Sequence, residues 1–306
     1  MTEISNVALL DLTGATNADV LDKTDRISNV ACILVPESLV GKLMAIPMTN
    51  VAATVPIPDG KHVKVMTGQV VMSGEALTSG ESAENDILIA AGQLVITSPV
   101  QRAVRQQIVA IGQVVAPEGS ETGLGAALNR MSGQVIYYPF TEGARVRTMT
   151  TGGQVAGDEL ANKTGQPTDI LIAVGPLVIT SPVEHLGYGH IVAVGSMVAP
   201  RSAQALLTGR VTAIDGGVMY YSAEPRVFDG KETFSGAFFD LLDEPISLVL
   251  DGKFTFADDV TPDQLKRAVK EIMFDGKLIA SPKLVPMLQV LARQRSGKIQ
   301  TSDEAE

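Results

Sequence analysis

Short apolar runs recur along the chain at nearly constant intervals. Runs such as ILIA, from Ile87, and IVAI, from Ile108, are rich in Ile, Val and Ala. They are followed by Gly, Pro or an Asp-Gly pair, which are residues that favour turns. A run of this length and composition predicts a strand that is buried on at least one face.

The spacing of these runs predicts how the strands are arranged. Ile87 and Ile108 lie 21 residues apart, and the tripeptide DGK begins at Asp229, Asp251 and Asp275, at intervals of 22 and 24. Such intervals are too short for a full β-α-β crossover at every step, so we expect successive strands to stack in parallel. The sequence therefore predicts a mainly β protein, a parallel β-solenoid (β-helix) with about 21–24 residues per coil and short helical corners.

A longer repeat is superimposed on this period. The segment DILIAAGQLVITSPV, from Asp86, returns from Asp169 as DILIAVGPLVITSPV, identical at 13 of 15 positions and displaced by 83 residues. A fixed period held over such a length is typical of repeat architectures. We place the two copies near residues 66–148 and 149–231, and attribute their identity to packing against equivalent neighbours.

The last part of the chain has a helical pattern. TPDQLKRAVKEI, from Thr261, and SPKLVPMLQVLARQR, from Ser281, each begin with a capping residue and Pro, followed by an apolar stripe at helical spacing. An uncovered solenoid end exposes unpaired strand edges. The pattern therefore predicts a β-solenoid body over residues 1–260, and a C-terminal helical cap with a short acidic tail over residues 261–306.

The opening of the chain has no comparable cap, because ISNVALLDL begins directly as a strand at Ile4. We expect this strand to contact a second copy of the chain through Ile4, Val7 and Leu9. An isologous contact between two N-terminal ends leaves the two capped ends facing outward. A homo-oligomer is therefore predicted, with a dimer favoured over a filament.

The charge balance narrows the range of partners. The chain has 24 Lys and Arg against 34 Asp and Glu, a net charge of −10. This charge disfavours binding to nucleic acid, while a protein partner is compatible with it. No apolar run reaches the roughly 18 to 20 residues that span a bilayer, and no export signal precedes the first strand. The expected location is the cytoplasm.

Patterns typical of catalysis or metal binding are missing from the sequence. There is no G-x-S-x-G, and the only histidines are His62, His185 and His190, of which the last two have a spacing that suits neither a helix face nor a strand face. Cys32 lies inside an expected strand, which favours a buried thiol. We expect no metal and no cofactor. The preferred interpretation is a non-enzymatic structural or scaffold protein that self-associates through solenoid ends or walls.

One acidic and aromatic segment, near residues 234–244, supports an alternative. Carboxylates of this kind serve as general acid and base in the cleavage of glycosidic bonds. The alternative is a carbohydrate-binding or carbohydrate-active β-helix. Its candidates are three carboxylates for catalysis, and two aromatic rings and one cation for binding: Asp240, Asp243 and Glu244, then Phe238, Phe239 and Arg226.

The recurring order of strand, Pro, polar residues and Leu, as in ACILVPESL and KLIASPKLVPML, resembles uncharacterised bacterial β-solenoid proteins built from such coils. More distantly, the Gly- and Val-rich strands resemble bactofilins, which are polymer-forming cytoskeletal β-helices. The resemblance implies parallel coils and self-assembly, and supplies no catalytic residue. The chain departs from bactofilins in its longer coils, its C-terminal helical segment and its lack of disordered flanks, which argues against end-to-end filaments.

Overall fold

The computed structural model describes residues 2–14, 17–78, 86–102, 107–125, 127–128, 130–149, 153–214 and 216–304. The chain divides into two compact units, Met1–Thr141 (unit 1) and Glu142–Glu306 (unit 2). Strands predominate in the described residues of both units, and the paired strands among them run parallel. The expectation of a mainly β chain with parallel strands is therefore confirmed.

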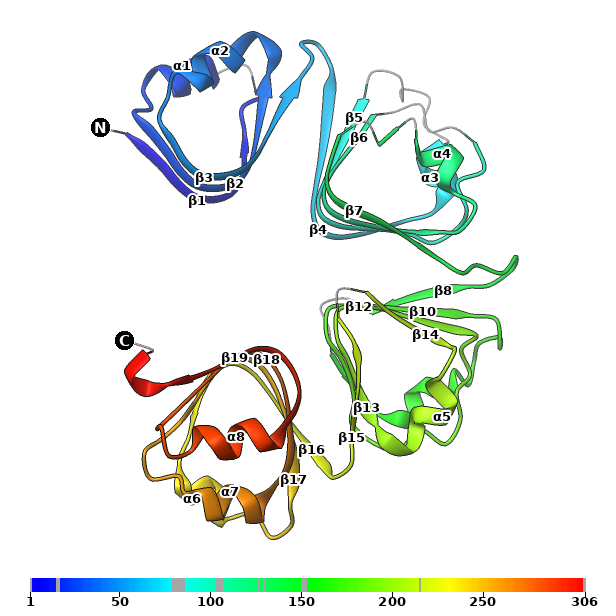
Figure 1. Cartoon of the computed structure of the whole chain (residues 1–306). Helices are drawn as coiled ribbons and strands as arrows, with labels where there is room; N and C mark the ends of the chain where they lie inside the picture. The colour runs from blue at the N-terminus through cyan, green and yellow to red at the C-terminus, as the bar shows by residue number, and fades with distance from the viewer. Residues whose placement is uncertain are drawn as a thin grey trace. The chain divides into compact units, whose positions relative to one another are not determined.

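Unit 1 contains two sheets, ordered β1-β2-β3 and β4-β5-β6-β7. Figure 1 shows the strands of each sheet stacked on one another, with short helices beside them. The strands are β1 (Glu3–Asp11), β2 (Arg26–Pro36), β3 (Met48–Ile57), β4 (His62–Met72), β5 (Asp86–Ile96), β6 (Gln107–Pro117) and β7 (Arg130–Tyr138). The helical segments are α1 (Asn17–Asp22), η1 (Glu37–Leu39), α2 (Val40–Met44), α3 (Gly74–Thr78) and α4 (Glu121–Gly125). These segments match the short helical corners that the sequence predicts.

Unit 2 contains three sheets, ordered β8-β10-β12-β14, β9-β11-β13-β15 and β16-β17-β18-β19. The strands of the first two sheets are β8 (Val146–Met149), β9 (Gly153–Val155), β10 (Ile170–Val174), β11 (Leu177–Ile179), β12 (His190–Val194), β13 (Met197–Pro200), β14 (Val211–Ile214) and β15 (Val218–Tyr221). The strands of the third are β16 (Glu224–Phe234), β17 (Ile246–Phe256), β18 (Val269–Ala280) and β19 (Ala292–Thr301). The helical segments are η3 (Gly157–Ala161), η4 (Arg201–Ala203), α5 (Gln204–Leu207), α6 (Gly236–Asp240), α7 (Pro262–Ala268), α8 (Val285–Leu291) and η5 (Ser302–Glu304).

The strands form several small sheets and not the single continuous solenoid that the regular spacing predicted. The strand spacing itself is close to the prediction: Ile4 pairs with Ile27, and Ile27 with Met48. The physical reason for the division is that many strands are apolar on both faces, as in β13, where all residues are buried. A single rod would leave its outer apolar face in water, whereas separate stacks bury that face against one another.

Two apolar seams show this packing within each unit. In unit 1, the outer faces of the two sheets meet through buried residues that include Leu34, Ile57 and Ile89. In unit 2, the sheet β9-β11-β13-β15 meets the sheet β16-β17-β18-β19 through residues that include Val198 and Met273. Each unit therefore has cores inside its stacks and a further apolar seam between two of its sheets.

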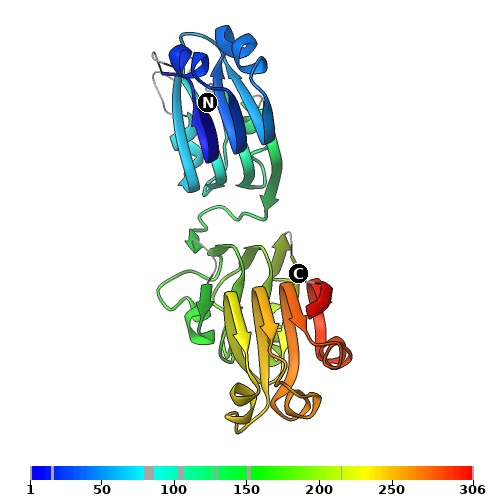
Figure 2. The same ribbon diagram turned by 90° about the vertical axis from the view of Figure 1, so that its left-hand side faces the viewer.

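The C-terminal segment differs from the cap expected over residues 261–306. Its helices α7 and α8 alternate with β18 and β19, and these strands extend the sheet that begins with β16 and β17. Figure 2 shows β16, β17 and β18, yellow to orange, side by side and running in the same direction. The apolar stripes of α7 and α8, with Leu265 and Leu288, pack into the core of this stack beside Phe254. The helices α7 and α8 therefore pack into the same core as the strands between which they lie.

The DGK triplets mark bends inside strands. Asp229, Asp251 and Asp275 are in register on β16, β17 and β18, and each is followed by a glycine with positive φ. At Gly252, φ is +130°, and a Cβ there would collide with the carbonyl oxygen of Gly230 on the neighbouring strand. Glycine is therefore required where the stacked backbones bend, and the three aspartates are held in a row just before that bend.

Candidate functional site

A cavity of about 410 Å³ lies between the sheet β9-β11-β13-β15 and the sheet β16-β17-β18-β19 of unit 2; it is referred to below as the groove. Its floor is apolar and includes Val178, Val198, Met219, Val249 and Met273, most of which belong to the seam between the two sheets. Polar groups line its rim. The groove therefore combines an apolar base with a polar opening, an arrangement typical of ligand sites.

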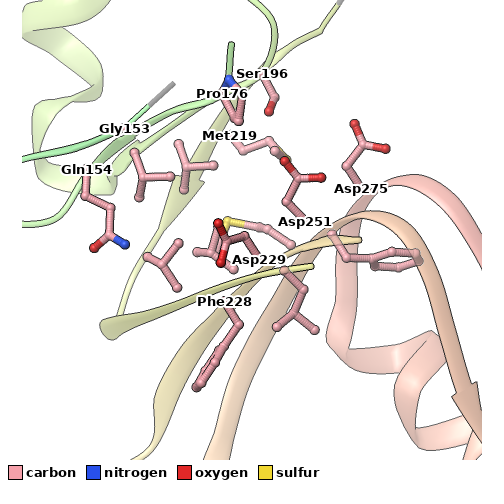
Figure 3. Close-up of a pocket in the computed structure, with 16 residues that line it drawn as sticks. Gly153, Gln154, Pro176, Ser196, Met219, Phe228, Asp229, Asp251 and Asp275 are labelled. Atoms are coloured by element: carbon pink, nitrogen blue, oxygen red, sulfur yellow. The ribbon is translucent and has the colours of Figure 1, made fainter. Parts of the chain in front are cut away.

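Three carboxylates line one side of the groove. Figure 3 shows Asp229, Asp251 and Asp275, one from each of three adjacent strands, with Pro176 and Ser196 contributed by the opposite sheet. Since the aspartates are in register on neighbouring parallel strands, their spacing is about 4.8 Å. Together they form a line of negative charge along one wall; it is named the Asp row.

The Asp row has an electrostatic cost in the folded protein. Burial raises the pKa of the Asp251 carboxyl above its ordinary value, and the neighbouring Asp275 and Asp229 raise it further. Within the described residues, none of the three forms an ion pair within 4.0 Å. Lysines follow two positions later in each strand, beyond the glycine bend, and are not among the residues that line the groove. A cation in the groove would relieve the repulsion within the row.

The opposite wall of the groove differs from the first copy of the repeat. Pro176 and Ser196 occupy the positions that Gln93 and Gln113 hold 83 residues earlier. In unit 1 these two glutamines stack, and Gln93 Nε2 donates to Gln113 Oε1 at 3.1 Å. The shorter Pro and Ser side chains leave space in unit 2 that two glutamines would occupy.

A second polar cluster lies in unit 2, in the segment between β9 and β10 and beside a cavity of about 450 Å³. Asn162, with a left-handed φ of 46°, donates from Nδ2 to Asp169 Oδ2 at 3.2 Å. Arg147 Nη1 donates to Asn162 Oδ1 at 3.2 Å and to Tyr188 Oη at 3.1 Å. These bonds satisfy the buried polar groups and fix this segment against β8, which is a structural role.

The acidic and aromatic candidates do not form one site. Phe239 is fully buried in the core, and the Phe238 ring packs 5.2 Å from that of Phe234. Asp240 Oδ1 accepts a hydrogen bond from Arg267 at 2.7 Å, which, with a second bond from Gln264, lowers the pKa of Asp240. Phe239 is thus engaged in core packing, while Phe238 is half-buried against the same core.

The remaining candidates are Asp243, Glu244 and Arg226. Asp243 and Glu244 are exposed in the turn before β17. Arg226 lies on β16, where its Nη2 is 3.1 Å from Glu224 Oε1. The groove, which uses other carboxylates of the same stack, was not anticipated from the sequence, although the spacing of the DGK triplets is a signal from which the Asp row could have been found.

The expected assembly residues are partly buried within unit 1. Ile4 and Val7 pack against the core inside the first stack, and Leu9 packs against the seam between the two sheets. Their side chains therefore contribute to folding. What β1 leaves unpaired is a backbone edge, because it pairs only with β2 among the described strands.

The buried position that the sequence predicted for Cys32 is confirmed, and the structure also places His185 and His190. Cys32 is buried, and burial raises the pKa of its thiol to about 11. His190 Nε2 lies 2.9 Å from Thr212 Oγ1, while His185 is exposed. In the described ranges, no three His, Cys, Asp or Glu side chains are grouped so as to hold a metal ion. None of the helices within those ranges is both long and apolar enough to cross a bilayer.

Comparison with known proteins gives no relative for this chain. No protein-family model, no curated protein and no solved structure matches it.

Proposed function

We propose that this protein is a non-enzymatic structural or scaffold protein that associates with copies of itself by adding strands at the edges of its parallel sheets. In this proposal each stack is a short parallel β-solenoid of 20–24 residues per coil, as the pairings of Ile87 with Gln107 and of His62 with Asp86 suggest. The supporting observation is that every sheet ends in strands that pair on one side only among the described residues.

An unpaired edge presents a row of N–H and C=O groups to a second chain. Natural proteins usually protect such edges with charges or Pro. The second half of β4, with the sequence MTGQVVM from Met66, has neither. Thr97 N donates to Met72 O at 2.9 Å, so the Met72 carbonyl faces β5. Because successive residues of a strand turn their backbone groups to alternate sides, the N–H of Val71 faces the unpaired side.

The proposed assembly by strand addition at sheet edges differs from the closed dimer that the sequence favoured. That preference depended on a C-terminal cap, whereas β19 is the last strand of its sheet and, among the described strands, pairs only with β18. In this proposal β19 therefore offers an edge as β1 does, and edge addition is not confined to β1. The distant resemblance to bactofilins is consistent with this proposal. The cytoplasmic location stays a prediction.

A proline at the open edge tests the proposal. Val71→Pro removes an N–H that faces away from β5, so the β4–β5 ladder is retained while a strand added at this edge loses a hydrogen bond. Val71→Thr keeps the N–H and is the matched control. By sedimentation velocity over a range of concentrations, we expect wild type and Val71→Thr to form assemblies that Val71→Pro does not, with the same circular dichroism spectrum. A wild-type protein that is monomeric at every concentration contradicts the proposed function, and assembly unaffected by Val71→Pro contradicts the choice of the β4 edge.

A further inference from the structure

We propose that the groove of unit 2 binds a linear aliphatic diamine or polyamine in its protonated form, laid along the Asp row across β16, β17 and β18. This inference is independent of the proposed self-association. It uses the cavity of about 410 Å³, the charge of the row and the apolar residues beneath it.

The geometry favours a flexible chain with several positive charges. The carboxylates repeat about every 4.8 Å along the stack, because they are in register on adjacent parallel strands. Ammonium groups separated by three or four methylenes match this repeat, and each can donate charge-assisted hydrogen bonds to a carboxylate. The methylenes between them would contact the apolar floor, with Val249 and Met273 beneath the row.

Charge complementarity excludes other occupants of the same size. An uncharged apolar ligand would desolvate Asp251, whose pKa is already raised by burial and by the other two carboxylates, without supplying a partner. A single metal ion requires ligands that converge on one point. The three carboxylates instead stand side by side on successive strands, and they are not grouped so as to hold a metal in the described part of the chain.

The repeat supplies a variant that closes the groove without disturbing the stack. Ser196 occupies the position that Gln113 holds in the first copy, where the same kind of stack accommodates the longer side chain. Ser196→Gln is therefore expected to fold and to occupy part of the cavity. Asp251→Asn removes the central charge of the row. Asp243→Asn removes one charge from an exposed position of the same unit that does not line the groove, and is the matched control.

The test is isothermal titration of the full-length chain with spermidine and with putrescine. 1,4-Butanediol serves as the uncharged analogue, and MgCl₂ at matched ionic strength as the inorganic cation. We expect saturable binding of spermidine, tighter than that of putrescine, and weakening with added salt as ion pairs are screened. Asp251→Asn and Ser196→Gln should each weaken spermidine binding by about tenfold or more, and Asp243→Asn should leave it within about twofold of wild type.

Several outcomes would overturn the inference. One is the absence of saturable binding at millimolar spermidine, and another is binding of Mg²⁺ as tight as that of spermidine. A third is a loss of spermidine affinity in Asp243→Asn equal to that in Asp251→Asn, which would indicate general attraction to an acidic protein. If Asp251→Asn weakens spermidine binding while Ser196→Gln does not change it, the cation lies on the acidic rim and outside the cavity. That result also contradicts the proposal. Circular dichroism of each variant separates loss of binding from loss of fold.

Discussion

The first copy of the 83-residue repeat, in unit 1, and the second copy, in unit 2, fill their interiors with the same side chains. Four inward positions along β5 and the matching β10 and β11 are identical in residue type and are buried in their respective cores. They are Leu88, Ala90, Leu94 and Ile96 in the first copy, and Leu171, Ala173, Leu177 and Ile179 in the second. The interior of a stack is therefore specified by the repeat itself.

The outward positions of the two copies are used differently. In the first copy, Ile87 and Ile89, which precede the glycine bend, pack in the seam with the neighbouring sheet. In the second copy, Val178 and Val198, which follow the bend, form the seam. The outward positions on the other side of each bend, such as Val95 and Ile172, are also buried, so the two seams differ in which buried outward positions face the neighbouring sheet of the same unit. Only the second arrangement leaves a groove beside an Asp row.

The largest expected effect tests the shared interior. Leu94→Ala and Leu177→Ala each delete a fully buried side chain from equivalent places in the two cores. Each should lower the free energy of unfolding by about 3 kcal/mol, through lost burial and the cavity that is left. Chemical denaturation followed by circular dichroism measures both. If one variant is affected far more than the other, the two interiors are not equivalent and the comparison fails.

A smaller effect tests the polar cluster around Asp169 in the second copy. The Asp169 carboxylate is buried and accepts hydrogen bonds from Gln166 N at 2.9 Å and from Asn162 Nδ2 at 3.2 Å. Burial by itself raises the pKa of Asp169, but these bonds and the Arg145 backbone N–H outweigh it, and the pKa is lowered. Asp169→Asn replaces an accepting oxygen with an NH₂ group that faces other N–H donors. We therefore expect the free energy of unfolding to fall by about 2 kcal/mol at pH 7.

The pH dependence of that loss has a definite sign. Because the pKa of Asp169 is lowered in the folded state, its stabilisation is present above the ordinary aspartate pKa of about 3.9 and decreases as the pH falls through the folded-state value. The difference between wild type and Asp169→Asn should therefore shrink in acid. Asp86→Asn, at the matching position of the first copy, is the control and should cost less at pH 7, since Asp86 is only partly buried. Equal losses would mean that the polar cluster does not distinguish the copies.

These comparisons also show what the sequence could predict. The regular spacing of the short apolar runs predicted parallel stacked strands, and the capping box at Thr261 is confirmed by a 3.2 Å bond from Gln264 N to Thr261 Oγ1. Both depend on residues that are close in sequence or repeated at a fixed interval. Local patterns of this kind specify a strand or a helix start without reference to the rest of the chain.

The number of sheets, the seams and the groove could not be predicted in the same way. Ile89 and its counterpart Ile172 are the same residue type in nearly the same local sequence, and both are buried. The seam described in unit 1 includes Ile89, which precedes the bend, whereas the seam described in unit 2 includes Val178, which follows it. Which outer positions are covered depends on a stack formed by distant residues. The capping residues of α7 were interpreted as the start of an end cap, because a capping box does not show whether its helix covers the end of a stack or one of its corners.

The smallest expected effect concerns the Asp row, which belongs to the sheet that packs against the second copy across the seam. The pKa of Asp251 is raised in the folded state by burial and by Asp275 and Asp229, so its ionisation destabilises the fold once the pH exceeds the ordinary aspartate value. Asp251→Asn should therefore stabilise the protein at pH 7, by about 0.5 kcal/mol or less, because the group is exposed enough for solvent to screen the repulsion. Near pH 3, where the carboxyl is protonated in both states, the gain should vanish. Thermal unfolding at the two pH values measures the difference, with Asp243→Asn, outside the Asp row, as the control for removing one acidic side chain. A gain that persists at pH 3 would mean that the substitution acts through packing, and the Asp row would then carry no repulsion for a bound cation to relieve.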